Sequence, residues 1–228
     1  GLINILICAV LYGFLPQRHK QQNKAYKSNN KHDVRWAMKQ PIFWALLICF
    51  SLFAAGATAF KFHLYPILIE KGLSIQDVMI ILAVMGPSQV LGRFLMGFIG
   101  SNISALQLGI LTTAVLPVTF LALAFLPTNI WFFIPFIILF GAATGIMTIV
   151  KGVAIPELLT REAYGAINGA MNIPIKLIKA ASPAIAAFVW VMTTSYDSVL
   201  ILLGLISLLA VICFTVVKHL SKFSQSPN

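Results

Sequence analysis

Long apolar runs separated by short polar breaks dominate this chain from residue 41 to residue 217. Six runs reach the length of a membrane-spanning helix, about 20 residues, and cover approximately 41–64, 75–100, 104–126, 130–150, 166–190 and 198–217. Their length and their lack of period-two alternation favour helices over the strands of a membrane β-barrel. The expected fold class is therefore an all-α integral membrane protein with a six-helix bundle.

The polar breaks have the composition of turns and helix starts. Between Arg93 and Lys151 the chain holds no Asp, Glu, Lys, Arg or His, so this stretch exceeds one span and must fold back on itself. Pro127-Thr128-Asn129 is expected to form the turn. Ser74-Ile75-Gln76-Asp77 has the spacing of a capping box and predicts the start of the second full span.

A shorter apolar run covers residues 1–15 and is expected to be the end of an earlier transmembrane helix. The chain begins without Met, and the basic residues follow this run instead of preceding it. The run is therefore interpreted as part of a fragment that lacks its N-terminal portion, and not as a signal peptide.

The basic residues indicate the orientation in the membrane. Residues 16–40 contain seven Lys and Arg against one acid, Asp33, which predicts a cytoplasmic loop. Alternating spans put residues 218–228 in the cytoplasm as a tail. On this threading the later basic residues of the cytoplasmic side are Lys151, Arg161, Lys218 and Lys222, and those of the outer side are Lys61 and Lys71. The net charge of +10 is thus attributed to topology and to attraction by membrane lipids, and no nucleic-acid partner is expected.

The cysteines and acids exclude several kinds of site. Cys8, Cys49 and Cys213 lie in apolar runs without Cys-x-x-Cys or Cys/His spacing, so they are interpreted as buried free thiols. We expect no metal and no cofactor. Loops or helix ends are expected for the acids that follow the basic loop: Glu70, Asp77, Glu157, Glu162 and Asp197. No carboxylate pair is therefore predicted at mid-membrane depth.

The strongest functional signal is a pair of lysines in the span at 166–190. Lys176 and Lys179 are the only charged residues between residues 163 and 195, and a cation at that depth costs roughly 2.5 kcal/mol or more. At helical spacing Asn168 and Asn172 share their face. Such a stripe normally lines a watery cavity and marks a substrate path, although snorkelling to the headgroups is the alternative. Pro174 and Pro183 flank the lysines and are expected to free backbone carbonyls.

Three further residues are candidates for substrate binding. Arg93 lies late in the second full span, with Gln89 one turn earlier on the same face, and its guanidinium suits carboxylates and other oxyanions. Close helix packing through Gly92 and Gly97 is the structural alternative for this segment. His63, at the outer end of the first full span, could bind substrate or relay a proton, or have no more than an interfacial role.

A basic loop, six spans and a cytoplasmic C-terminus together resemble the C-terminal half of a major facilitator superfamily transporter. The resemblance covers essentially the whole chain. It is carried by His63-Leu64-Tyr65-Pro66-Ile67-Leu68 before Gly72-Leu73-Ser74, Gly92-Arg93 with Gly97, Gly145-Ile146-Met147-Thr148-Ile149-Val150-Lys151-Gly152, Arg161-Glu162-Ala163-Tyr164-Gly165-Ala166-Ile167-Asn168-Gly169, and Lys179-Ala180-Ala181-Ser182-Pro183.

Within the superfamily the chain is similar to the bacterial branch of oxalate/formate exchangers and monocarboxylate carriers. The resemblance implies that Arg93 and Lys176 or Lys179 hold a carboxylate, and that two six-helix halves rock around a central site. The turn at 97–102 lacks the usual Asp and Arg cluster, so a charge network is not expected to gate there. The implied division is the end of the last N-terminal-half helix at 1–15, an inter-half loop at 16–40, the six-helix domain at 41–217 and the tail.

The sequence thus predicts a secondary transporter, not an enzyme, that moves a small organic anion such as a monocarboxylate or dicarboxylate. A coupling proton in symport, or an exchanged anion in antiport, is the expected second partner, and the missing N-terminal half is the third. The expected location is the bacterial inner membrane. Two alternatives are efflux of drugs or metalloid oxyanions, and an integral membrane enzyme acting on a phosphate-linked or lipid-linked substrate.

Overall fold

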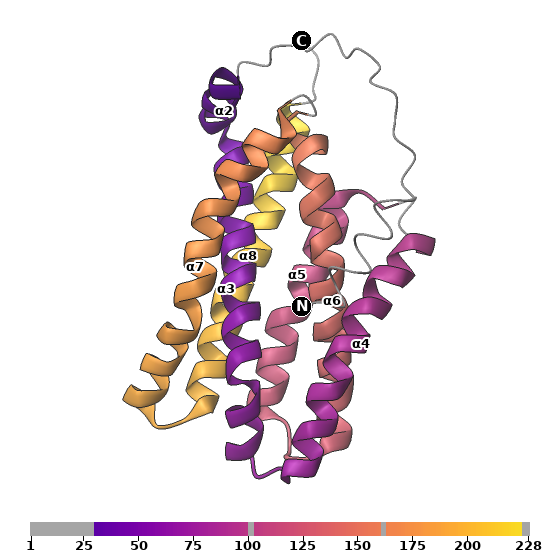
Figure 1. Ribbon diagram of the computed structural model, residues 1–228, viewed down its shortest axis with the longest axis vertical. Coiled ribbons are helices and arrows are strands. Elements are labelled where there is room, and N and C mark those ends of the chain that lie inside the picture. The colour runs from indigo at the N-terminus through magenta and orange to yellow at the C-terminus, as the bar shows by residue number, and fades with distance from the viewer. Residues whose placement is uncertain (1–29, 100–102, 161–162, 225–228) are drawn as a thin grey trace, which may run out of the picture.

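The computed structural model describes residues 30–99, 103–160 and 163–224. In this part of the chain a short helix, α2 (Asn30–Lys39), precedes six long ones (Figure 1). The long helices are α3 (Pro41–Glu70), α4 (Ile75–Ile99), α5 (Ala105–Phe125), α6 (Ile130–Leu158), α7 (Tyr164–Thr193) and α8 (Tyr196–Ser224). The predicted span at 1–15, loop residues 16–29, turn residues 100–102, Arg161-Glu162 and the end of the tail lie outside the described residues.

The six long helices confirm the expected fold class, because each is long and apolar enough to cross a membrane. Residues 30–39 of the predicted inter-half loop form the helix α2, and its Ala37 is fully buried. α3 and α6 run several residues past the predicted ends of their spans, to Glu70 and Leu158. Lys151, predicted to follow its span, therefore lies inside α6, and Lys61 lies well inside α3 instead of near its end.

Local sequence explains where several helices begin. The backbone N–H of Asp77 donates to Ser74 Oγ over 3.2 Å, and that hydroxyl donates to Asp77 Oδ2 over 2.8 Å, so Ser74 caps α4 as predicted. A full capping box that the prediction did not include, Ser104 with Gln107, starts α5. Asn129 caps α6 by accepting from the N–H of Trp131 over 2.9 Å, which confirms the turn at 127–129.

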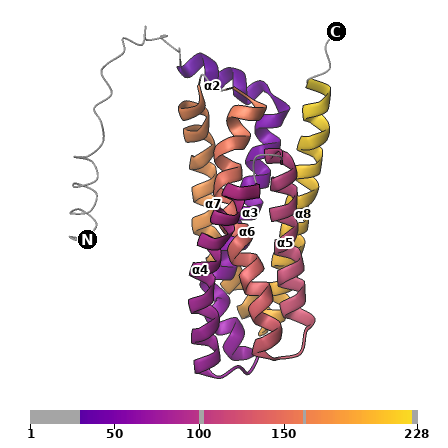
Figure 2. The same cartoon turned by 90° about the vertical axis from the view of Figure 1, so that its right-hand side faces the viewer.

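The helices form an open row, because the strongest pairings are α4 with α6, α6 with α5, α5 with α8, α8 with α3, and α3 with α7. α4 and α7 are the two edges of this row (Figure 1). Successive helices alternate in direction, so three short turns, α3–α4, α5–α6 and α7–α8, gather at one end of the bundle (Figure 2). We refer to this end as the turn end, and to the opposite end as the α2 end.

Two packing features fix the middle of the bundle. Phe60, Phe120 and Phe140 are fully buried, and their ring centroids lie 4.8 to 6.0 Å apart, which ties α3, α5 and α6 together. α4 and α6 approach so closely that a Cβ on Gly145 would overlap the backbone carbonyl oxygen of Gln89. Gly92 likewise lies against the backbone of Ala142, whereas Gly97 has nothing near it. Close helix packing, the structural alternative for this segment, is therefore confirmed at Gly92 but not at Gly97.

Candidate functional site

A cavity of about 380 Å³ lies between α3, α4, α6 and α7, and we call it the central cavity. Apolar side chains such as Phe50, Phe53 and Met147 form part of its wall. The polar residues of the lining are Thr58, Lys61, Gln89, Thr144, Thr148, Lys151, Asn172, Lys176 and Lys179. Four of them are lysines, and no carboxylate belongs to the lining among the described residues.

Lys176 and Lys179 both line the central cavity, in the middle of α7. Each side chain is exposed in the bundle, and neither forms a salt bridge or a side-chain hydrogen bond within the described part of the chain. α7 continues as a helix through Pro174 and Pro183. The carbonyl of Lys179, which Pro183 cannot satisfy because it lacks an N–H, accepts from the Ser182 hydroxyl over 3.0 Å.

Lys61 and Lys151 also line the central cavity, and sequence reasoning missed them. The predicted spans ended at 64 and 150, so both lysines were assigned to the edges of the membrane. A signal for Lys151 was present, because Thr144, Thr148 and Lys151 recur at helical spacing and form one polar stripe.

Specific contacts hold these two additional lysines. Lys61 Nζ lies 5.8 Å from the centroid of the buried Phe140 ring, a cation–π contact. Lys151 Nζ donates to Asn172 Oδ1 over 2.6 Å. Asn172 Nδ2 in turn donates to Asn168 Oδ1 over 2.8 Å and to the Asn168 carbonyl over 2.7 Å. Asn168 therefore lies behind the cavity wall and orients the amide that touches Lys151.

Gln89 and Arg93, predicted to act together, lie in different hollows. Gln89 lines the central cavity, and the close packing of Gly145 against its backbone fixes its position. Arg93 lines a neighbouring hollow of about 440 Å³ that also contains Glu157, nearer the α2 end. Arg93 is nevertheless close enough to Lys61 for their positive charges to interact.

His63 does not line the central cavity. Its Nε2 lies 3.0 Å from the Pro183 carbonyl oxygen and must donate to it, which places the proton of the neutral ring on Nε2. Its Nδ1 lies 3.2 Å from the hydroxyl of Tyr196 and accepts from it in that tautomer. His63 thus joins α3 to α7 and α8.

A polar cluster closes the turn end near His63. Glu70 accepts hydrogen bonds from Trp190 Nε1 over 3.0 Å and from the backbone N–H of Tyr196 over 2.6 Å. Lys71 forms a salt bridge to Asp197 over 2.5 Å and donates to the Ala124 carbonyl over 3.0 Å. Of the acids predicted in loops or at helix ends, Glu70, Asp77, Glu157 and Asp197 are at helix ends, and Glu162 lies outside the described residues. At the turn end, Glu70, Asp77 and Asp197 bond to groups of the protein.

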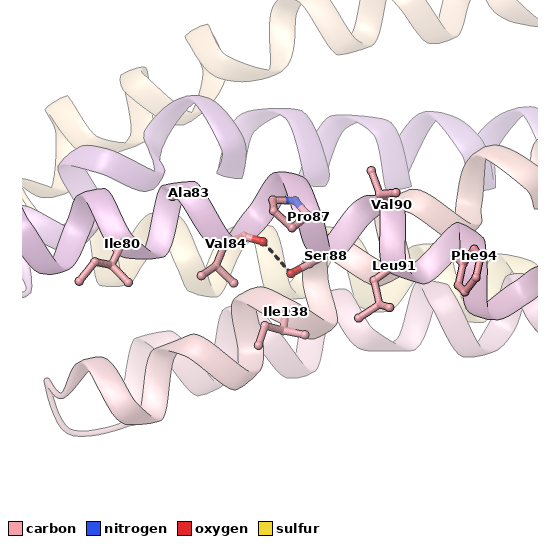
Figure 3. Close-up of a pocket in the computed structure, with 9 residues that line it drawn as sticks. All are labelled: Ile80, Ala83, Val84, Pro87, Ser88, Val90, Leu91, Phe94 and Ile138. Atoms are coloured by element: carbon pink, nitrogen blue, oxygen red, sulfur yellow. Dashed lines mark hydrogen bonds between the residues drawn. The ribbon is translucent and has the colours of Figure 1, made fainter.

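Another hollow, of about 880 Å³, lies between α4 and α6 and is apolar (Figure 3). Apolar side chains from Ile80 to Ile138 line it, and none of its lining residues carries a charge. Its one hydroxyl, on Ser88, already donates to the Val84 carbonyl over 2.7 Å (Figure 3). This surface suits lipid or another helix and offers no group for chemistry.

No group of three or more His, Cys, Asp or Glu side chains in residues 30–99, 103–160 and 163–224 could hold a metal ion. Cys49 is a buried free thiol and Cys213 a partly buried one, whereas Cys8 lies outside the described part.

Comparison with known proteins identifies the family. The model of the Major Facilitator Superfamily matches residues 1–173, about three quarters of the chain. The "Uncharacterized transporter ESBP6" of Saccharomyces cerevisiae is 31% identical over 121 residues, which is 53% of this chain and 18% of that protein. The matched region thus spans less than a fifth of the length of the yeast relative. The chain belongs to the major facilitator superfamily.

Proposed function

We propose that this chain is the C-terminal six-helix half of a secondary transporter that moves a small organic anion by alternating access. The superfamily match and the transporter-named relative support membrane transport over the enzyme alternative. The observation that carries the anion proposal is the central cavity, where four lysines and no described carboxylate form the lining.

The residues of the central cavity have distinct proposed roles. Lys176 and Lys179 attract and hold the anion, because they present ammonium groups without partners among the described residues. Gln89 and Asn172 donate or accept hydrogen bonds that orient it. Asn168 acts through Asn172 as a positioning residue.

Arg93 and His63 have different proposed roles, because each lies outside the central cavity. Arg93 is proposed to attract the anion at the α2 end, beside the hollow it shares with Glu157. Both ring nitrogens of His63 are engaged with Pro183 and Tyr196, which favours coupling of helix movements over direct substrate contact. Proton relay through His63 stays a prediction.

The proposed orientation places the α2 end in the cytoplasm, since the basic residues of the 16–40 segment lead into it. The C-terminus of α8 then lies on the same side. The bacterial inner membrane stays a prediction, and the yeast relative extends the comparison to a eukaryotic organism. The first half of the superfamily fold is proposed to close the open side of the row between α4 and α7.

A thermal-stability screen of the complete purified protein tests this function. Small carboxylates are expected to raise the melting temperature, because a ligand that binds the folded state stabilises it. Lys179→Gln is expected to abolish that shift, whereas Lys71→Gln, outside the central cavity, is expected to retain it. Shifts with sugars or cationic drugs, unaffected by Lys179→Gln, would contradict anion binding. Shifts with metalloid oxyanions alone would instead support the efflux alternative.

A further inference from the structure

The four lysines of the central cavity lie at different depths. At a helical rise of about 1.5 Å per residue, Lys61 lies roughly 14 Å from the turn end of α3, and Lys151 roughly 30 Å from the turn end of α6. Lys179 and Lys176 lie between these depths on α7. We call this series, in the order Lys61, Lys179, Lys176 and Lys151, the lysine ladder.

The two ends of the lysine ladder are held by uncharged groups. Lys61 lies over the ring of Phe140, which Phe60 and Phe120 fix in the core. Lys151 is bonded to Asn172 over 2.6 Å. A ring face and an amide oxygen orient an ammonium group without neutralising it, so neither contact supplies a counter-charge at the ends of the ladder.

Repulsion between Lys179 and the lysines at the two ends of the ladder makes a bound negative charge more favourable. Lys179 is close enough to both Lys61 and Lys151 for their charges to repel one another. A single bound carboxylate compensates the lysines near it and leaves the far end uncompensated. A molecule with a negative group at each end can compensate both.

We propose that Lys61 and Lys151 are substrate-binding residues that adapt the central cavity to an elongated dianion, namely an aliphatic dicarboxylate. One carboxylate is held by Lys61 and Lys179, and the other by Lys151 and Lys176. The inference rests on the proposed anion transport and names the substrate class of that same site.

Uptake of succinate and butyrate into liposomes containing the complete protein tests this inference, because the two acids have the same carbon chain length and differ by one carboxylate. Succinate is expected to be preferred by at least about tenfold, since one charged hydrogen-bonding group is added. Lys61→Gln and Lys151→Gln are each expected to weaken the apparent affinity for succinate about tenfold and to change that for butyrate less than about twofold.

Lys71→Gln is the matched control, because Lys71 is paired with Asp197 outside the central cavity, and it is expected to leave the succinate-to-butyrate ratio unchanged. If a ladder variant fails to fold, the preference of the unchanged protein, measured by competition with dicarboxylates of increasing length, still decides the question. Equal transport of both acids would overturn the inference and leave anion transport standing. Absence of any anion uptake would overturn both.

Discussion

Lys71 and the lysines of the central cavity are the same residue type in two opposite settings. Lys71 at the turn end is 14% exposed, pairs with Asp197 and donates to a backbone carbonyl. The lysine ladder forms no salt bridge within the described residues, and it shares one cavity without a described carboxylate. At the turn end the counter-ion belongs to the fold, whereas the described residues provide none in the cavity.

This difference distinguishes a charge that is paired within the fold from one that can bind an external anion. A cation at membrane depth is costly unless it is paired or faces water, and a pair that breaks leaves its partner uncompensated. Lys71 is already compensated, so an external anion gains little from it. The lysine ladder has no counter-charge among the described residues, which makes a bound anion the proposed source of one.

Reversal of one ladder charge is expected to have the largest effect. Lys179→Glu places a carboxylate among the other lysines, where it can pair with them and repel an incoming anion. Transport of a labelled organic anion into liposomes is expected to fall by at least about a hundredfold, as for loss of a charged contact plus a new repulsion. Lys71→Glu, which breaks the turn-end pair, should lower stability but retain transport in the folded fraction.

Disruption of the packing between α4 and α6 is expected to have the next largest effect. Gly145→Ala would press a methyl group into the backbone of Gln89. The expected loss of stability is about 1 to 3 kcal/mol, measured as a lower melting temperature in detergent. Gly86→Ala is the matched control, because Gly86 on α4 has nothing within 4 Å of its Cβ position. Equal melting temperatures for the two variants would show that the close approach is not required.

A carboxylate introduced into the central cavity is expected to pair with a lysine there, as Asp197 pairs with Lys71 at the turn end. Asn172→Asp keeps the shape of the side chain and places a carboxylate against Lys151, which now bonds to the amide oxygen. The anion then competes with a built-in partner, so its apparent affinity is expected to fall about tenfold. Isothermal titration would measure this, and unchanged affinity would mean that Lys151 does not contact the substrate.

Loss of the turn-end pair is expected to have the smallest effect. Asp197 is 50% exposed, so Asp197→Asn is expected to cost about 1 kcal/mol or less. Lys71 keeps its bond to the Ala124 carbonyl in this variant. The melting temperature would report the change, and a shift in substrate preference would contradict the separation between the two regions.

Composition and periodicity predicted most of the fold but not where its helices end. The six spans and the turn at 127–129 follow from apolar runs about as long as the membrane is thick. α3 and α6 extend past those runs, and buried residues of the extensions, such as Ile67 and Ile155, pack into the core of the bundle. Lys151 lies in the extension of α6 and Lys61 near the predicted end of its span, and for that reason neither was predicted as a cavity residue.

Residues of the central cavity were predictable from the sequence where they share a face of one helix. Asn172, Lys176 and Lys179 share a face of α7, and the structure places all three on the central cavity. Arg93 and Gln89 share a face of α4 as well, but only Gln89 lines the central cavity, whereas the hollow that Arg93 lines lies among α4, α6 and the start of α5. Which hollow a side chain enters depends on helix pairing, and one sequence does not encode that pairing in its periodicity.

The most direct test of the central claim is uptake of labelled succinate by three forms of the complete protein. These are the unchanged protein, the control Lys71→Gln, and the double variant that combines Lys176→Gln and Lys179→Gln. The account predicts that the unchanged protein and Lys71→Gln accumulate the anion and that the double variant, with an unchanged melting temperature, does not. Full uptake by a correctly folded double variant would contradict the claim that the lysines of the central cavity bind the substrate.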